Sequence, residues 1–325
     1  MSMSATSDQP RVLFVTPEVS FVPIGSGKNC EYFNIKPDGF AGFLSQLFEN
    51  LFARGADVHI TQPDYRSLFS DIFRGSNNMA TRKIPENRVH LTEDRAFFYT
   101  RRPELNDQWE NIRISLAFQR EVFHQILPLV QPDLIHCHGW MTGLIPAMAA
   151  SLEIPCIFTL QNFETGKSPL AEIEDMGIDA AAFWQHLYFD RFPLNYEETR
   201  EINPVNFLLS GILAADYASA AGPAHLLKIG ESLIRFPGAF LGKVLSEKLA
   251  ISCRAVSDDQ MAIMQYIDLY EQALQRPLTE IKEDRFEIWT HFSDPRDTAN
   301  IDFKKALQVN QRQSPCKASI ERRIP

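Results

Sequence analysis

The sequence predicts an α/β protein built on a doubly wound, mostly parallel β-sheet with a helical appendage at its C-terminal end. The first observation is that residues 132–160 read as an apolar strand, a short helix and a second apolar strand. Such a βαβ unit requires a parallel sheet that is buried on both faces. The second is that the same alternation recurs over the first 220 residues and gives about five main strands. The third is that a chain of 325 residues, 45% of them hydrophobic, is large enough to enclose such a core.

The N-terminal elements follow one another in this alternating order. Residues 11–16 are a short apolar run and form the first predicted strand. A long loop is expected over residues 19–38. Residues 39–54 carry apolar side chains at helical spacing and end at Gly55, which predicts a helix packed on the sheet. Residues 57–61 form the second strand.

The long loop contains the sequence GSGK at residues 25–28, which resembles part of a phosphate-binding loop. The spacing of that motif requires Gly at position 22 and Ser or Thr at position 29. The chain has Val22 and Asn29 instead. We therefore expect no nucleotide-binding P-loop here.

Residues 64–108 are polar and are expected to be irregular, apart from a pair of strands at Val89–Leu91 and Ala96–Tyr99. A long helix is predicted over Trp109–Val130. It is expected to end near two prolines, Pro128 and Pro132, because proline cannot continue a helix.

In the βαβ unit, the helix is predicted over Thr142–Ala150 and the second strand over Ile154–Leu160. An insertion at residues 164–203 is rich in acidic and aromatic side chains. Its aromatic rings can stack on sugars or simply pack together, and both interpretations are open. After the insertion we predict a helix over Pro204–Ala214 and a strand over Asp216–Ala220.

The character of the chain changes after Ile229. A short helix is predicted over Phe236–Leu249, and a longer helix with an apolar stripe over Asp258–Gln275. The tail from about Asp294 is polar and charged, which is typical of disorder. We divide the chain into a disordered N-terminus (1–10), an α/β domain (11–232), a helical appendage (233–277) and a partly disordered tail (278–325).

Composition and charge exclude several classes of protein. The net charge of −9 argues against a nucleic-acid or anionic-membrane partner. The chain contains no run of about 18 apolar residues, and it starts without the basic and apolar stretches of a secretory signal. Its five cysteines are scattered and odd in number, which fits a reducing cytoplasm.

Polar side chains follow the two strands of the βαβ unit, where ligands of parallel sheets are bound. His136 and His138 end the first strand, and Gln161 and Asn162 follow the second. Cys137 lies between the two histidines, but neighbouring strand residues point to opposite faces, so the three side chains cannot converge on a metal ion. We expect no metal site. A role of the histidines in lining a cleft and a purely structural role are both open.

Four segments, in this order and spacing, resemble the N-terminal half of the ADP-glucose-type glycogen and starch synthases. The first segment resembles the first strand of that family with its Glu-Val, and the second segment resembles the family's KTGGL motif. The third resembles its PDVVHAHDWHT, and the fourth its NFLKAGI and the Ala-Asp that follows. In this chain the segments are residues 12–19 (VLFVTPEV), 36–40 (KPDGF), 132–142 (PDLIHCHGWMT) and 206–216 (NFLLSGILAAD). Together they cover residues 11 to about 230.

The resemblance implies the N-terminal, Rossmann-like domain of a two-domain GT-B glycosyltransferase. Residues 266–271 (YIDLYE) resemble the last helix of that fold, so we expect the family's nucleotide-binding domain to be missing between the two parts. The family reaction transfers glucose from ADP-glucose to an α-1,4-glucan. It needs no cofactor besides this donor.

The resemblance also implies site residues. In the family, the lysine of KTGGL helps to hold the donor, the glycine backbone beside it approaches the phosphates, and the histidine after the second strand of the unit lies against the sugar. The substrate-binding positions in this chain are then Lys36, Gly39, His136, His138, Trp140, Gln161 and Asn162.

The chain departs from the family at several of these positions. Asp38 places a carboxylate where diphosphate oxygens would approach, and like charges there repel. Gly139 and Met141 replace the aspartate and the second histidine of HDWHT. Gln161 replaces the active-site histidine, and glutamine can donate a hydrogen bond but cannot carry a proton or a charge. No catalytic residue is therefore assigned.

Three hypotheses follow. The chain is a glycogen/starch synthase-like protein of α-glucan metabolism with weak or absent transfer on its own. Alternatively, it is half of a split glucosyltransferase that gains its donor domain from a separate protein. The third hypothesis is a glucan-binding or protein-interaction module that forms homo- or hetero-oligomers.

Overall fold

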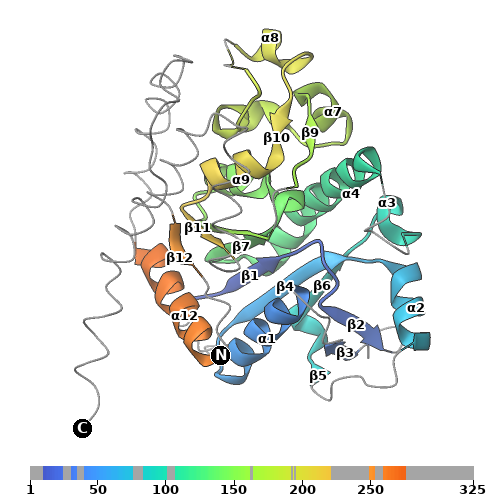
Figure 1. Cartoon of the computed structure of the whole chain (residues 1–325), viewed down its shortest axis with the longest axis vertical. Coiled ribbons are helices and arrows are strands. Elements are labelled where there is room, and N and C mark those ends of the chain that lie inside the picture. Colours follow the sequence, from blue (N-terminus) through green and yellow to red (C-terminus); the bar gives the residue numbers. More distant parts are fainter. Residues whose placement is uncertain are drawn as a thin grey trace, which may run out of the picture.

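The computed structural model of the chain describes residues 10–24, 31–34, 40–75, 83–100, 107–161, 164–191, 193, 195–220, 249–252 and 259–275. Figure 1 shows these residues as ribbons, coloured along the sequence.

A seven-stranded sheet forms the centre of the molecule. Its strands lie in the order β12-β11-β8-β7-β1-β4-β6, and every neighbouring pair runs parallel. In chain order the strands are β1 (Val12–Val15), β4 (Val58–Pro63), β6 (Val89–Thr92), β7 (Leu134–His138), β8 (Cys156–Leu160), β11 (Tyr217–Ala220) and β12 (Leu249–Ser252). The predicted doubly wound parallel sheet is confirmed. The strand order reverses at β1, so the carboxyl ends of β1 and β7 flank the position where such sheets bind ligands.

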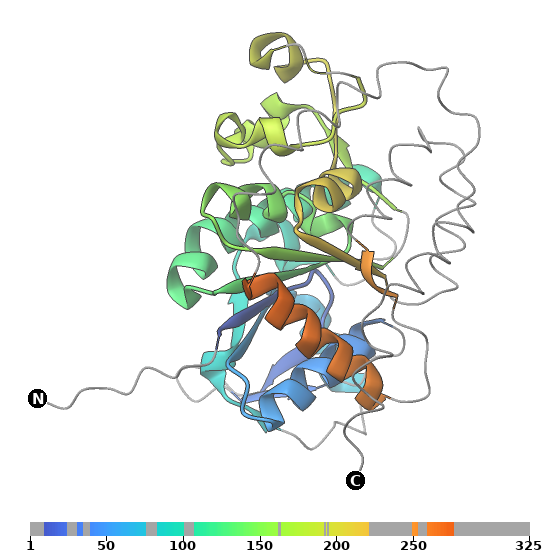
Figure 2. The same ribbon diagram turned by 90° about the vertical axis from the view of Figure 1, so that its left-hand side faces the viewer.

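Helices cover both faces of this sheet, as Figure 1 shows. On one face lie α1 (Phe40–Ala53) and α12 (Asp259–Gln275), and on the other α4 (Gln108–Glu121), α6 (Ile145–Ser151) and α9 (Phe207–Ala214). Successive strand residues alternate between the two cores: Phe14 packs on the side of α1, and Val15 on the side of α4. Figure 2 shows α12 alongside α1, with which it is in contact.

The predicted helix at residues 39–54 and the long helix at 258–275 are confirmed by α1 and α12. Residues 236–248 and the tail lie outside the described residues. Leu249, predicted as the end of a helix, is instead the first residue of β12. The domain boundaries themselves stay predictions. None of the helices among the described residues is long and apolar enough to cross a membrane.

The region 64–108 is more regular than predicted. It contains α2 (Arg66–Gly75), and the strand predicted at Ala96–Tyr99 is wrong because α3 (Arg95–Phe98) is a helix. The Asp94 side chain caps this helix by accepting a hydrogen bond from the Ala96 backbone N–H. The predicted strand near Val89–Leu91 is confirmed as β6.

The predicted long loop at residues 19–38 contains two strands. These are β2 (Phe21–Ile24) and β3 (Glu31–Asn34), which form a small antiparallel sheet with β5 (Lys83–Ile84). Gln62 fixes the start of β2: its side chain accepts hydrogen bonds from the Ser20 and Phe21 backbones and donates one to the Phe21 carbonyl. The GSGK sequence at residues 25–28 lies outside the described residues.

The predicted helix at Trp109–Val130 is present as α4, a π-helical turn η3 (Val122–Ile126) and α5 (Leu127–Val130). It ends near Pro128 and Pro132, as predicted, although Pro128 itself lies within the helix. Pro128 stands in the first turn of α5, directly after the wider π turn, where its missing N–H is tolerated. The helix ends at Gln131, whose backbone is left-handed with φ 50°.

The insertion 164–203 folds into a small subdomain at one end of the molecule. It contains α7 (Leu170–Asp175), α8 (Tyr196–Arg200) and β9 (Lys167–Ser168), which pairs with β10 (Val205–Asn206). Three of its aromatic side chains pack on one another: Trp184 makes edge contacts with Phe189 and Tyr196. Packing therefore accounts for these three rings.

Candidate functional site

The candidate site lies at the carboxyl ends of β7 and β8. The two strands pair in parallel with His136 opposite Ile157 and His138 opposite Thr159. Beyond the strand ends, the Gly139 backbone N–H donates a hydrogen bond to the Thr159 carbonyl at 3.0 Å. This register brings three of the predicted site residues, His136, His138 and Gln161, to one edge of the sheet.

His136 is fully buried beneath α12. Its Nδ1 lies 2.9 Å from the Tyr270 hydroxyl and its Nε2 lies 2.7 Å from the Thr159 hydroxyl, so both ring nitrogens have a partner. A ligand that reached this ring would have to displace one of these two hydroxyls.

The Thr159 hydroxyl continues the hydrogen-bond chain. It lies 2.5 Å from the Ser219 hydroxyl, which in turn is 3.3 Å from the Tyr266 hydroxyl. Tyr266 and Tyr270 are one helical turn apart on α12, so the chain of hydrogen bonds starts and ends on the same helix. It holds α12 on β7, β8 and β11.

Burial sets the protonation state of both histidines. Burial, with a smaller contribution from His138, lowers the pKa of His136 well below its ordinary value. Burial also lowers the pKa of His138 to about 3. The His138 ring stacks on Phe14, with ring centroids 5.9 Å apart and planes at 5°. Two neutral imidazoles thus lie in the core, with their centroids 4.1 Å apart.

Gln161 lies against Gly139. The Gly139 backbone has φ 73° and ψ 167°, a conformation that essentially only glycine adopts. The Gln161 carboxamide oxygen stands so close to Gly139 that a Cβ at position 139 would collide with it. Gln161 Nε2 is buried without a hydrogen-bond partner within the described ranges. The glutamine side chain therefore fills the space in which a side chain at position 139 would lie.

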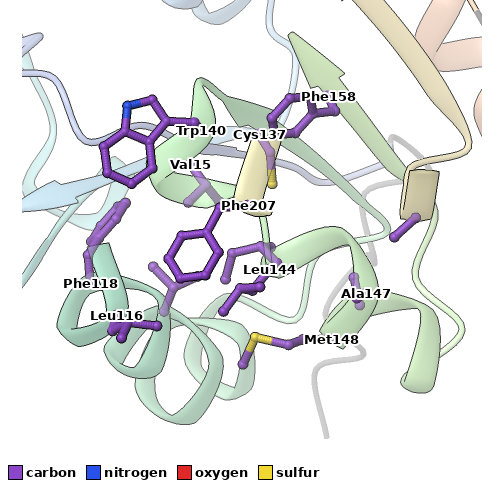
Figure 3. Close-up of a cluster of buried hydrophobic side chains, with 14 of the residues drawn as sticks. Val15, Leu116, Phe118, Cys137, Trp140, Leu144, Ala147, Met148, Phe158 and Phe207 are labelled. Atoms are coloured by element: carbon purple, nitrogen blue, oxygen red, sulfur yellow. The ribbon is translucent and has the colours of Figure 1, made fainter. Parts of the chain in front are cut away.

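Trp140 is a core residue rather than a wall of an open cleft. Its side chain is only 7% exposed, and its ring centroid lies 6.3 Å from that of Phe207. Gly166 permits the close approach, since a Cβ there would meet the indole ring. Figure 3 shows Trp140 among Phe207, Leu116 and other buried side chains.

Three other predicted site residues, Lys36, Gly39 and Asn162, lie outside the described residues. Their substrate-binding roles stay predictions. Across the part of the chain that the structure describes, no three His, Cys, Asp or Glu side chains are grouped so that they could hold a metal ion.

Glu18 has a shifted pKa and was not among the site residues predicted from the sequence. Glu18 follows β1 at the same edge of the sheet, is half-buried, and has its pKa raised by burial. Burial raises the pKa of the fully buried Tyr65 hydroxyl, and the nearby Glu18 carboxylate raises it further. A carboxylate directly after the first strand of a parallel sheet is the signal that could have identified it.

The chain is similar to known proteins over most of the described region. Residues 11–233 match the family model described as the starch synthase catalytic domain. A glycogen synthase from Geobacillus thermodenitrificans is 23% identical over 261 residues, which cover 72% of this chain and 49% of that protein. A glycogen synthase from Rhodopirellula baltica is 28% identical over 146 residues, or 40% of this chain and 27% of the relative.

A solved structure has a similar fold. The catalytic domain of starch synthase IV from Arabidopsis thaliana, bound to ADP and acarbose, superposes with a TM-score of 0.51 at 17% identity. The match covers 74% of this chain and 51% of that one. The chain thus spans about half the length of the first curated relative it matches and of this structure.

Proposed function

The chain belongs to the starch synthase catalytic domain family, and from this premise we propose that it binds α-glucan without transferring glucose on its own. The proposal has two parts, a ligand class taken from the family and a loss of chemistry inferred from the strand-end residues.

The contact between Gln161 and Gly139 carries the proposal. By resemblance, these positions hold a histidine and an aspartate in the family. In this chain the end of the glutamine side chain occupies the space beside the glycine, and an aspartate at 139 would force it to move. The two departures are therefore spatially coupled. Neither Gly139 nor Gln161 can accept or release a proton, so neither can act as a general acid or base at this edge of the sheet.

The position of His136 supports the same conclusion. Both of its ring nitrogens are hydrogen-bonded, to Tyr270 and Thr159, and burial keeps the ring neutral. A neutral imidazole with no free nitrogen stabilises the fold and offers nothing to a phosphate or a sugar hydroxyl.

The family and the relatives support the ligand class. The two relatives described above are glycogen synthases, and the similar solved structure was determined with ADP and acarbose. We propose that the chain retains the affinity for the glucan and has lost the use of the nucleotide sugar.

One experiment tests both parts. The purified chain is incubated with glycogen and glucose-labelled ADP-glucose, the glycogen is pelleted, and protein and label in the pellet are measured. We expect protein without label, and release of the protein by maltoheptaose but not by a β-1,4-linked oligosaccharide.

Each part fails in a recognisable way. Label in the glycogen contradicts the loss of transfer. Protein that stays in the supernatant contradicts glucan binding. If that unbound protein also sediments as an oligomer in the ultracentrifuge, the interaction hypothesis takes its place.

A further inference from the structure

Two histidines face each other at the edge of the sheet opposite the candidate site. His59 is the second residue of β4 and His90 the second residue of β6, and these strands are neighbours. Nδ1 of His59 lies 2.9 Å from Nε2 of His90, and the rings stack with centroids 5.2 Å apart and planes at 16°. β6 is the terminal strand of the sheet. The histidine pair therefore joins this strand to the rest of the fold.

The guanidinium of Arg88 fixes the tautomers of the pair. Arg88 Nη1 lies 2.8 Å from Nε2 of His59, and a guanidinium only donates hydrogen bonds. Nε2 of His59 must therefore accept, so the proton of the neutral ring is on Nδ1. That Nδ1–H donates to Nε2 of His90. The chain from Arg88 through His59 to His90 exists only while both rings are neutral.

The charges around the pair do not favour protonation. Asp57 is the nearest carboxylate, 3.3 Å from Nε2 of His59, but it pairs with Arg88 and also with Arg11. The Asp133 carboxylate accepts from the Arg11 backbone N–H at the start of β1. Of the side chains on η3, which packs on β6, only His124 is ionisable, and it is exposed.

We propose that the His59–His90 pair is an acid-sensitive joint that holds β6 and the 3₁₀ turn before it (Glu86–Arg88) on β4, and releases them when a ring is protonated. A proton on Nε2 of His90 would point at the N–H of His59 and break the hydrogen bond between them. The new charge would also stand near Arg88, whose carboxylate partner Asp57 is already shared with Arg11.

The expected pKa values agree with this geometry. Burial and the Arg88 charge lower the pKa of His59, and burial and the His59 charge lower that of His90 to about 4. In the unfolded chain a histidine titrates near 6.5. Because the pKa values are lower in the folded state, the histidine pair contributes its full stabilisation above about pH 6.5. This contribution decreases as the pH falls toward 4.

Hydrogen exchange tests the joint strand by strand. Protection factors are measured for amides of β6 and of β8 between pH 7 and pH 4. As the pH falls below 6.5, the equilibrium constant for the opening of β6 should rise by up to about tenfold per pH unit for each proton taken up. The equilibrium constant for the opening of β8 should change less. Equal changes in the two strands would overturn the proposal.

The His90→Gln variant isolates the titrating group, since a glutamine oxygen can accept from His59 but takes up no proton. We expect the pH dependence of β6 to shrink in this variant, and to persist in the control His124→Gln. An unchanged pH dependence in His90→Gln contradicts the proposal. If that variant does not fold, NMR titration of the wild-type His90 ring decides, since a midpoint near 6.5 excludes the joint.

Discussion

The hydroxyl of Tyr270 lies 2.9 Å from Nδ1 of His136, across 134 residues of sequence. This contact holds α12 on the middle of the sheet, over a histidine for which the sequence left a cleft-lining role and a structural role open. The strand end where the family resemblance is strongest is thus a packed part of the core.

Removing the Tyr270 hydroxyl should weaken the whole domain. In Tyr270→Phe, Nδ1 of His136 loses its partner inside the core, which costs about 1–3 kcal/mol of unfolding free energy. Urea unfolding measures the change. In the matched control Tyr266→Phe the loss should be smaller, because Ser219 keeps its shorter bond to Thr159. A Tyr270→Phe protein within 0.5 kcal/mol of wild type would contradict the contact.

Position 139 should not accept a side chain. Gly139→Ala introduces backbone strain of about 1–3 kcal/mol and also forces the flexible end of the Gln161 side chain to move, which adds a smaller cost. Adding Gln161→Ala should remove this smaller cost and leave the strain, so a double-mutant cycle should show coupling between the two sites.

Gly55→Ala is the control for this cycle. Gly55 also has a positive φ, 87°, but nothing lies near its missing Cβ, so this variant reports backbone strain alone. Additive effects of Gly139→Ala and Gln161→Ala would show that the two residues are not in contact.

The two histidines of β7 should not titrate near neutral pH. Because burial lowers both pKa values, the ring signals of His136 and His138 in NMR spectra should stay constant from pH 5 to 8. The unfolded chain takes up these protons first, so the unfolding free energy should fall as the pH drops below about 6.5. A midpoint near 6.5 for either ring would show that the ring is open to water.

Cys137 and Cys156 should be inert thiols in the folded protein. Both are buried and their sulfurs are 3.7 Å apart, so reagents cannot reach them, and burial also raises the pKa of the Cys156 thiol. A thiol reagent such as DTNB should react with them only after unfolding. The test uses a variant with Cys30, Cys253 and Cys316 replaced by serine; reaction in its native state contradicts the burial.

The central sheet could be predicted from the sequence because its strands are continuous apolar runs, such as Cys156–Leu160, separated by amphipathic helices. The errors have local or distant causes. The helix α3 depends on one capping side chain, Asp94. The strand β2 depends on Gln62, some 41 residues away, and no periodicity reveals such a contact.

The candidate site shows the same division. The sequence identified the strand ends and the residues that depart from the family, Gly139 and Gln161. It did not reveal that these two touch, because a contact between adjacent strand ends depends on register and on one glycine's backbone. Nor did it reveal that His136 is covered, since Tyr270 comes from a helix far along the chain.

The most direct test of the central claim is the rate at which the purified chain transfers labelled glucose from ADP-glucose to glycogen, measured beside a two-domain glycogen synthase. We predict incorporation equal to a blank without protein, in preparations that still sediment with glycogen. Incorporation above the blank that increases in proportion to the concentration of the chain would contradict the account.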